Sequence, residues 1–246
     1  MPNSRVLVVS TTPDYIQAIL CRYPGRAVFI TDRRVRAHAA EPRPPAEDEL
    51  LGDLGDPATV LASLREHLRR HGQEPAGVAC FDCESLALAS FVGSALGLHF
   101  PSAEAVTACR SKLECKRRWR RAGVACPRAG HVSNETEARA FLEKLAAPAV
   151  LKPLTGSGSE LTFQCDGPDG LASAFRVIHD RLAHHGDGRM YATRRARHVF
   201  AMEEFIPGDE YSADFIVEDG QVRIIRVAAK LPAKDQTFGV TRAYIV

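Results

Sequence analysis

The chain has 246 residues, 45% hydrophobic and 25% charged, which is typical of a globular protein with one large or two to three small domains. A net charge of +2 argues against a dedicated nucleic-acid-binding protein, and no apolar run approaches the length of a membrane span. The seven scattered cysteines favour reduced thiols, and the first apolar stretch is too short for a signal peptide, so we expect a cytoplasmic protein.

The first part of the chain alternates between strand and helix patterns. Residues 5–9 form a short apolar run that predicts a buried strand, residues 15–22 have helical spacing, and residues 27–30 predict a second strand. This order predicts a parallel, Rossmann-like sheet. No Gly-x-Gly-x-x-Gly follows the first strand, so we interpret Asp32 as a helix cap or a surface acid, not as a ribose ligand.

Further along, residues 41–57 are rich in Pro, Asp and Glu and are expected to form a connecting loop with little structure of its own. A strand is predicted over residues 77–81 and a helix over residues 85–98. Between the loop and this strand, a helix over residues 58–71 places one apolar face inward, formed by Val60, Leu61, Leu64 and Leu68.

Two helices are predicted next, over residues 102–109 and 112–122. The second contains the most basic run of the chain, residues 116–121, interrupted by Trp119. Such a run could bind RNA. Because its charges are distributed around the helix, we favour a solvated helix with Trp119 packed inward.

A lysine-ended strand and a Gly/Ser loop follow a capped helix that ends near residue 145. Residues 149–151 predict a buried strand that Lys152 closes, and residues 155–159 supply glycines, hydroxyls and backbone N–H groups. Glycines let a backbone approach a ligand closely, and consecutive N–H groups form a concavity that suits phosphate. The alternative is an ordinary hairpin with a flexible tip and a surface lysine. No Gly-Lys-Ser/Thr follows, so the loop is not a P-loop.

The last part of the sequence predicts an amphipathic helix followed by a β meander. The helix spans residues 168–184, and its inward positions are Leu171, Phe175, Ile178 and Leu182. Strands are predicted over residues 200–206, 211–217 and 221–230, with a tight hairpin at Asp219-Gly220, and one more strand is expected before the end of the sequence.

Three segments, in this order, resemble motifs of the ATP-grasp superfamily. The first is a lysine-headed helix that ends in Ala-Gly-Val-Ala-Cys-Pro, over residues 111–127. The second is the lysine-ended strand with its Gly/Ser loop, over residues 149–159, and the third is Met-Glu-Glu-Phe-Ile-Pro-Gly-Asp-Glu-Tyr-Ser-Ala-Asp, over residues 202–214. The sequence is most similar to the carboxylate–amine ligase branch, near the amino-acid ligases and the carbamoyl-phosphate-synthase-like members.

The resemblance implies an α/β protein in which a Rossmann-like pre-ATP-grasp domain precedes an incomplete ATP-grasp fold of the α+β type. The expected domains are the Rossmann-like domain over residues 1–110, the N-terminal subdomain of the ATP-grasp fold over residues 111–190, and a truncated start of its C-terminal subdomain over residues 191–246. We therefore expect a fragment, a truncated product or one piece of a split protein.

The resemblance also implies a nucleotide site. Two lysines would hold the phosphates of ATP, with Lys152 as the catalytic one, and the Gly/Ser loop would form a flap over them. The side chain of Glu203, the backbone carbonyl of Glu204 and the backbone N–H of Ile206 would bind the adenine edge. A carboxylate suits a ribose diol because it accepts two hydrogen bonds. The full set of expected binding residues is Lys112, Lys152, Thr155, Gly156, Ser157, Gly158, Ser159, Glu203, Glu204, Phe205, Ile206, Glu210 for the ribose, and Lys230.

The activity implied by the resemblance is ATP-dependent ligation of a small-molecule carboxylate to an amine through an acyl phosphate. The family also requires Mg²⁺, whose ligands would lie beyond residue 246, because Asp235 is the only acidic residue after Lys230. We expect little or no turnover from this chain and no metal ligand within it. The alternatives are a non-catalytic nucleotide-binding subunit with an exposed apolar face, and a biotin-carboxylase-type or carbamoyl-phosphate-type enzyme. We expect a homodimer, or a partner that supplies the missing part, and we expect no binding to membranes or nucleic acid.

Overall fold

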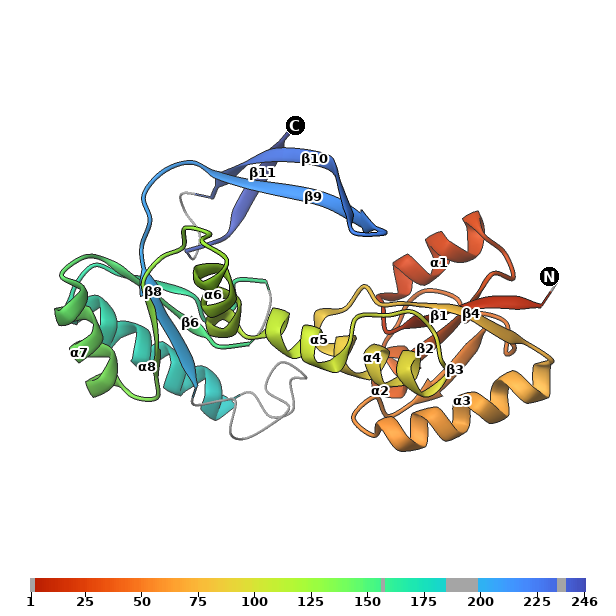
Figure 1. Ribbon diagram of the computed structural model, residues 1–246. Helices are drawn as coiled ribbons and strands as arrows, with labels where there is room; N and C mark the ends of the chain where they lie inside the picture. The colour runs from red at the N-terminus through yellow and green to blue at the C-terminus, as the bar shows by residue number, and fades with distance from the viewer. Residues whose placement is uncertain (1–2, 156–157, 185–198, 234–237) are drawn as a thin grey trace. The chain divides into compact units, whose positions relative to one another are not determined.

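The computed structural model describes residues 3–155, 158–184, 199–233 and 238–246, apart from the side chains at 182–184. The chain divides into two compact units, Met1–Arg110 and Ser111–Val246 (Figure 1). No helix among the described residues is long and apolar enough to cross a bilayer.

The first unit is built on a four-stranded parallel sheet with the strand order β3-β2-β1-β4. Its strands are β1 (Ser4–Val9), β2 (Ala27–Asp32), β3 (Glu49–Gly52) and β4 (Glu74–Ala79). The central strand β2 is buried along its whole length, which explains its continuous apolar sequence. The predicted parallel, Rossmann-like sheet is therefore confirmed.

Helices pack on the sheet of the first unit through two separate apolar clusters. Ile16 of α1 packs with Val8 and Phe29, whereas Leu64 of α3 packs with Leu7 and residues of α4. Val8 and Leu7 are neighbours on β1, so their side chains leave opposite faces of the sheet. The helices are α1 (Pro13–Arg22), α2 (Arg33–Ala37), α3 (Pro57–His71), a 3₁₀ turn (Cys83–Ser85), α4 (Leu86–Ala95) and α5 (Ala103–Arg110).

Two features of this unit refine the sequence-based expectations. Residues 41–57 are not merely a loop, because β3 lies within them and pairs in parallel with β2, Ile30 opposite Leu50. The prediction that Asp32 caps a helix is confirmed. Its Oδ1 accepts hydrogen bonds from the backbone N–H groups of Arg34 at 2.8 Å and Val35 at 3.3 Å, at the start of α2.

The second unit contains an antiparallel sheet with the strand order β5-β8-β6-β7. Its strands are β5 (Ala129–Val132), β6 (Ala149–Pro153), β7 (Phe163–Cys165) and β8 (Phe200–Glu204). The unit also contains α6 (Lys112–Arg121), α7 (Glu135–Leu145) and α8 (Pro168–His184). Leu142 of α7 and the predicted inward residues Leu171, Phe175 and Ile178 of α8 are buried in one core, whereas the side chain of Leu182 lies outside the described residues.

The two faces of this sheet differ in character. Leu151 of β6 stands opposite Met202 of β8, and both are fully buried in the core under α7 and α8. Because side chains alternate along a strand, the adjacent pairs, Val150 with Glu203 and Lys152 with Ala201, turn to the other face. The register of β6 and β8 therefore places a lysine and a glutamate side by side on the face away from the core.

A second sheet of this unit is a three-stranded meander of β9 (Glu210–Glu218), β10 (Gln221–Pro232) and β11 (Thr241–Ile245), with β10 in the centre. Asp219 and Gly220 form the predicted tight turn, and both have positive φ, 49° and 74°. The expectation that residues 200–206 begin this meander is wrong, because β8 instead pairs with β5 and β6.

Candidate functional site

A cleft of about 800 Å³ opens within the second unit. It brings together residues from α6, β6, β8, β9 and β10 and from the loops between them. Of the residues expected to bind nucleotide, those that line it are Lys112, Lys152, Thr155, Ser159, Glu203, Glu204, Phe205, Ile206, Glu210 and Lys230. Residues more than 100 positions apart in the sequence thus share one cavity large enough for a nucleotide.

At the back of the cleft, one carboxylate lies between two ammonium groups. The side chain of Glu203 is 5% exposed, and its Oε2 lies 2.6 Å from Nζ of Lys116. Its Oε1 forms an ion pair with Nζ of Lys152, whose side chain is 22% exposed. The three residues come from β8, α6 and β6, so the cluster joins two strands of the sheet to the helix that covers this face.

The cluster shifts the acid–base behaviour of Lys152. Burial, together with the positive charges of Lys116 and Lys112, lowers the pKa of Lys152 to about 8. The negative charge of Glu210 acts in the opposite direction and raises this pKa, but by less. Burial also lowers the pKa of Lys116. Lys152 is therefore still mostly protonated at neutral pH, and it loses its charge at a much lower pH than an ordinary lysine.

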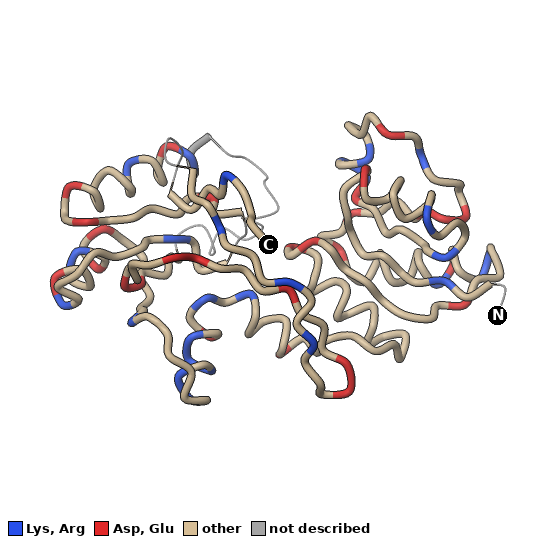
Figure 2. The backbone as a smooth tube through the Cα atoms, turned by 90° about the horizontal axis from the view of Figure 1, so that it is seen from above, with Lys and Arg blue, Asp and Glu red and all other residues tan. Residues whose placement is uncertain are grey.

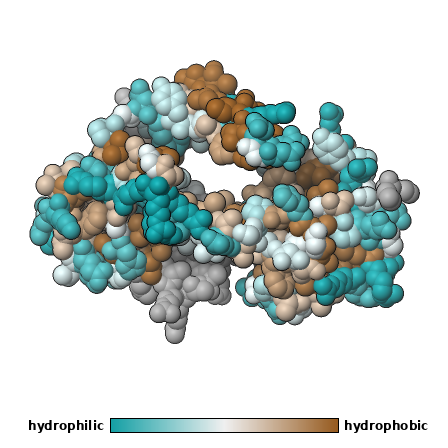
Figure 3. All heavy atoms as spheres, viewed as in Figure 1, coloured by the Kyte–Doolittle hydropathy of each residue, from teal (hydrophilic) through white to brown (hydrophobic). Residues whose placement is uncertain are grey.

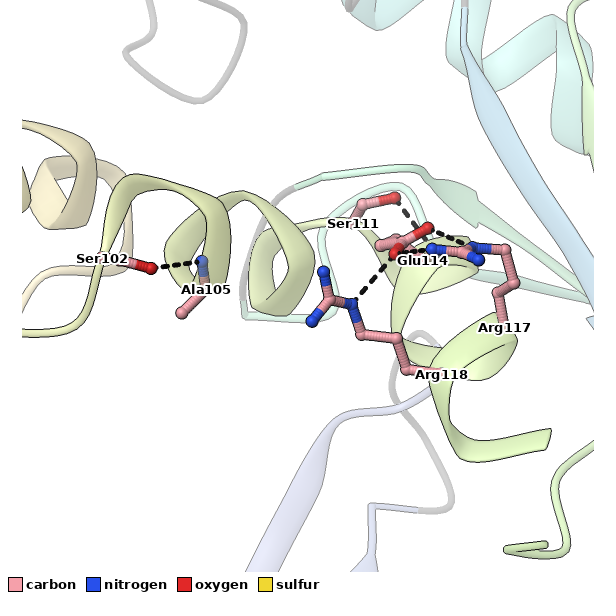
Figure 4. Close-up of polar contacts among 6 residues, drawn as sticks. All are labelled: Ser102, Ala105, Ser111, Glu114, Arg117 and Arg118. Carbon is pink, nitrogen blue, oxygen red and sulfur yellow. Dashed lines mark hydrogen bonds and ion pairs between the residues drawn. The ribbon is translucent and has the colours of Figure 1, made fainter. Parts of the chain in front are cut away.

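Helix α6 begins at the cleft and presents most of its charge away from it. Oγ of Ser111 caps the helix by accepting a hydrogen bond from the backbone N–H of Glu114 at 3.3 Å, and the Glu114 carboxylate pairs with Arg117 and Arg118 on the helix surface (Figure 4). In the first unit, Oγ of Ser102 caps α5 in the same way, accepting from the backbone N–H of Ala105 at 3.2 Å.

The basic run on α6 is arranged differently from the sequence-based expectation. Lysines and arginines are concentrated on this helix (Figure 2). Trp119 was expected to pack inward but is 46% exposed, and that prediction is wrong. Lys116 takes the buried position instead, at 8% exposure, with its Nζ 5.7 Å from the centroid of the Trp119 ring. The ion pair with Glu203 provides the reason, because a buried carboxylate needs a partner.

The loop after β6 reaches across the cleft to the loop that precedes β11. Oγ of Ser159 donates a hydrogen bond to the backbone carbonyl of Gly239 at 3.1 Å. Gly158 is exposed, has a φ of 67° and does not line the cleft. The loop's root is tied to α6, since the backbone N–H of Lys112 donates to the carbonyl of Leu154 at 3.2 Å. The other two loop residues expected at the phosphates, Gly156 and Ser157, lie outside the described residues.

The segment after β8 forms one wall of the cleft. The carboxylate of Glu204 is held by the guanidinium of Arg128, with both oxygens at 3.1 Å. The backbone N–H of Phe205 donates to the carbonyl of Pro148 at 2.9 Å. Its ring packs edge-on against Phe238, with the centroids 6.1 Å apart. Glu204 lines the cleft, and its paired side chain is 26% exposed.

Glu210 and Lys230 lie on the opposite wall. They stand directly opposite each other on β9 and β10, and their side chains form an ion pair. Glu210 is the more exposed partner, at 66%, against 19% for Lys230. A carboxylate that is held on one side and open on the other can still accept hydrogen bonds from a diol.

Sequence reasoning missed several residues of this cleft. The most important is Lys116, which was assigned to a solvated helix face. The signal was its spacing of four residues from Lys112, which puts both lysines on the same side of α6. The others are lining residues to which the sequence analysis assigned no role, and they are Pro127, Val150, Pro153, Glu160, Thr162, Pro207, Gly208, Asp209, Pro232, Phe238 and Gly239.

The cleft offers cationic and polar groups but no cluster of metal ligands. No group of three or more His, Cys, Asp or Glu side chains suited to a metal ion occurs in the described part of the chain. Asp235, the only acidic residue after Lys230, lies outside that part. The described lining residues thus offer ammonium groups and hydrogen-bonding groups to a polar, anionic ligand.

Comparison with known proteins identifies the fold to which this cleft belongs. A family model described as the ATP-grasp domain matches residues 145–246. A search of curated proteins gave no significant match. The family match covers Lys152, the loop after it, Glu203, Glu210 and Lys230, which together account for most of the cleft.

Solved structures agree with the family match. The L-amino acid ligase from Bacillus licheniformis superposes with a TM-score of 0.72 at 18% identity, covering 99% of this chain and 54% of that one. Carboxyaminoimidazole ribonucleotide synthase from Aspergillus clavatus, complexed with ATP, gives 0.63 at 16% identity, with 95% and 56% covered. The biotin carboxylase domain of the Hydrogenobacter thermophilus 2-oxoglutarate carboxylase, in complex with MgADP and bicarbonate, gives 0.62 at 18% identity, with 95% and 51% covered.

Residues 145–246 therefore match the ATP-grasp domain family, and the whole chain shares the fold of these solved structures. Its Rossmann-like first unit is followed by an ATP-grasp fold, as the sequence motifs predicted. The chain spans about half the length of the solved structures that it matches.

Proposed function

We propose that this chain carries the nucleotide-binding part of an ATP-dependent ligase that joins a carboxylate to an amine. The observation that carries the proposal is the cleft itself. Lys112, Lys152, Thr155 and Ser159 from the ends of the Gly/Ser loop, the strand that ends in Glu203 and Glu204, and Glu210 all line one cavity, although they are dispersed over the sequence. The match to the ATP-grasp family supports this assignment.

In this proposal the charges of the cleft match the parts of ATP. Lys152 and Lys112 bind the phosphates, and Lys152 stabilises the charge that develops on the transferred phosphoryl group. The residues from Glu203 to Ile206 bind the adenine edge, and Glu210 binds the ribose hydroxyls. When bound, Mg²⁺ supplies further neutralisation of the terminal phosphates. The proposal includes the domain boundaries expected from the sequence, with the Rossmann-like domain over residues 1–110 and the two ATP-grasp subdomains over residues 111–190 and 191–246.

The reaction has two steps. A substrate carboxylate oxygen attacks the γ-phosphorus of ATP, and the bond from that phosphorus to the bridging oxygen breaks, giving an acyl phosphate and ADP. The amine nitrogen then attacks the acyl carbon, inorganic phosphate leaves, and the ammonium proton passes to solvent. The L-amino acid ligase among the similar structures favours an amino acid as the carboxylate.

The first test is calorimetric titration of Mg–ADP into the protein. We expect binding by the unaltered chain and a loss of about tenfold or more in Lys152→Ala and in Glu210→Ala, since each variant removes a charge-assisted contact. Lys144→Ala is the matched control, because Lys144 is exposed on α7 at the opposite face of the sheet. If the unaltered chain does not bind nucleotide, or if both site variants bind as tightly as the control, the proposal is wrong.

A second candidate is a non-catalytic nucleotide-binding subunit that works beside further polypeptide. Strands β9 and β10 favour it, because consecutive apolar side chains along them are exposed, and hydrophobic atoms gather over these strands on the face seen in Figure 3. They include Phe215, Ile216, Val217, Val222, Ile224, Ile225 and Val227, each at least 50% exposed. Acyl-phosphate formation by the isolated chain with ATP and Mg²⁺, abolished by Lys152→Ala, would contradict this candidate.

A carboxylase or carbamoyl-phosphate-type reaction is the runner-up among enzymes. The biotin carboxylase domain matches the fold almost as well as the ligase, so the fold does not discriminate between the two reactions. Substrate-dependent release of phosphate separates them. Stimulation by bicarbonate alone would favour the carboxylase type, whereas stimulation that needs both an amino acid and an amine would favour the ligase.

A further inference from the structure

Lys116 is buried behind the cleft, in contact with a residue of the cleft but not with the cleft itself. It is 8% exposed, it does not line the cavity, and its Nζ lies 2.6 Å from Oε2 of Glu203. The other basic residues in the last two turns of α6, from Arg117 to Arg121, are exposed. Lys116 is thus buried, whereas its basic neighbours on α6 are exposed. Burying its ammonium group costs desolvation free energy unless an ionic partner compensates for it.

We propose that Lys116 is a positioning residue for nucleotide binding, which neutralises Glu203 from behind so that the charge of Lys152 remains available to the phosphates. The inference rests on the proposed function and deepens it. It assigns a role to Lys116, to which the sequence motifs gave none. That role is to preserve the positive charge that Lys152 presents to the cleft.

The charge balance of the cluster supports this role. Glu203 contributes one negative charge, and its two oxygens are each paired with an ammonium group, Oε2 with Lys116 and Oε1 with Lys152. The trio carries a net charge of about +1 when both lysines are protonated. If Lys116 were absent, Glu203 and Lys152 would form a neutral pair, and a phosphate would have to compete with a whole carboxylate for Lys152.

The positions of Lys152 and Lys116 determine which of the two ammonium groups a ligand in the cleft can contact. Lys152 lines the cleft, whereas Lys116 approaches Glu203 from α6, with the Trp119 ring beside its ammonium. The backbone of Lys116 is also held, since its carbonyl accepts a weak hydrogen bond from Sγ of Cys126 at 3.7 Å. The positive charge that a ligand can reach is therefore that of Lys152.

The same arrangement links Lys116 to the titration of Lys152. The charged groups around Lys152 are Lys112 and Lys116 on α6, Glu203 on β8, Glu210 on β9, and Lys230 on β10, which is paired to Glu210. Loss of Lys116 removes a like charge and leaves Glu203 to Lys152 alone. Both changes raise the pKa of Lys152.

The experiment compares Lys116→Met with Arg121→Met, which removes the same charge from an exposed site on the same helix. Mg–ADP is titrated into each variant at several pH values between 7 and 10, and folding is checked by thermal unfolding. We expect Lys116→Met to lose about tenfold in affinity at pH 7.5 and its alkaline loss of binding to start about one pH unit higher. Lys116→Arg keeps the charge and restores both properties. The same affinity and pH profile in Lys116→Met as in Arg121→Met would overturn the inference.

The Glu203→Gln background separates a role through Glu203 from a merely structural one, and it remains informative if Lys116→Met alone does not fold. With the carboxylate removed, Lys116 has nothing to neutralise, so Glu203→Gln and the double variant Glu203→Gln/Lys116→Met should bind Mg–ADP equally. A further tenfold loss in the double variant would contradict the inference. If the unaltered chain binds no nucleotide, the proposed function itself is wrong. Normal binding that is insensitive to Lys116 would contradict only the role of this residue.

Discussion

At the scale of single residues, the cleft is defined by how its charges are shared. Glu203 pairs with two lysines, Glu204 with Arg128, and Glu210 with Lys230. Each of these three carboxylates of the cleft wall therefore already has a cationic partner. Of the three, Glu203 is buried, and a buried charge that lacks a partner is costly, so its two lysines allow this carboxylate to lie beside an apolar core.

The pH dependence of nucleotide binding follows from Lys152. Its pKa is lowered to about 8 by burial, Lys116 and Lys112, and a phosphate binds the protonated form better. Well below pH 8 the ammonium is charged and the attraction is complete, whereas above pH 8 the proton must first be taken up. We expect the affinity for Mg–ADP to be constant up to about pH 7, to be about halved near pH 8, and then to fall by up to tenfold per pH unit.

Calorimetry across this range checks the prediction. The control is Lys152→Met, which should bind weakly and show no such decline. A decline in the unaltered chain that begins only near pH 10, where an ordinary lysine titrates, would show that the environment of Lys152 is not as described.

At the scale of elements, α7 packs so closely on β5 that one position admits only glycine. A Cβ added at Gly130 would lie 2.8 Å and 3.0 Å from ring atoms of Phe141, and this ring is packed against the core of the second unit. The glycine is therefore required by the approach of the helix, not by an unusual backbone angle.

We expect Gly130→Ala to lower the free energy of unfolding by about 1–3 kcal/mol, because the Phe141 ring or the strand must move. Gly77→Ala in β4 is the matched control, since a Cβ there meets nothing within 4 Å. Chemical denaturation of the two variants measures the difference. Equal stability of the two variants would mean that α7 shifts freely on the sheet.

At the scale of the whole molecule, each unit has a core of its own. The clusters of the first unit, which contain Leu7, Leu64 and Phe29, include no described residue beyond position 110, and the cluster around Leu151 and Met202 includes none before position 111. A compact unit with its own apolar core can fold alone.

Residues 1–110 expressed alone are therefore expected to fold, with a cooperative thermal transition and the circular dichroism of an α/β protein. Two substitutions on α3 supply the controls. Leu64→Asp, which places a charge in the fully buried core, should abolish the transition, whereas Glu66→Gln on the exposed face of the same helix should preserve it. A fragment that stays unfolded would show that its core depends on residues 111–246.

The sequence alone determined the features that depend on local patterns. Apolar periodicity located most helices and strands, and the motifs around Lys112, Lys152 and Glu203 indicated the ATP-grasp fold, because a binding motif needs particular residue types in a particular order. The short strand β3 was missed, since its flanking Pro, Asp and Glu residues are typical of a loop and only pairing with β2 orders it.

Only the tertiary structure decided which residues meet. The position of β8 between β5 and β6 is a non-local pairing that no local pattern encodes, and it places Glu203 beside Lys152. On α6, helical spacing allowed either Trp119 or Lys116 to face inward. A buried carboxylate on a distant strand selected the lysine, because an unpaired buried charge costs more free energy than an exposed tryptophan ring.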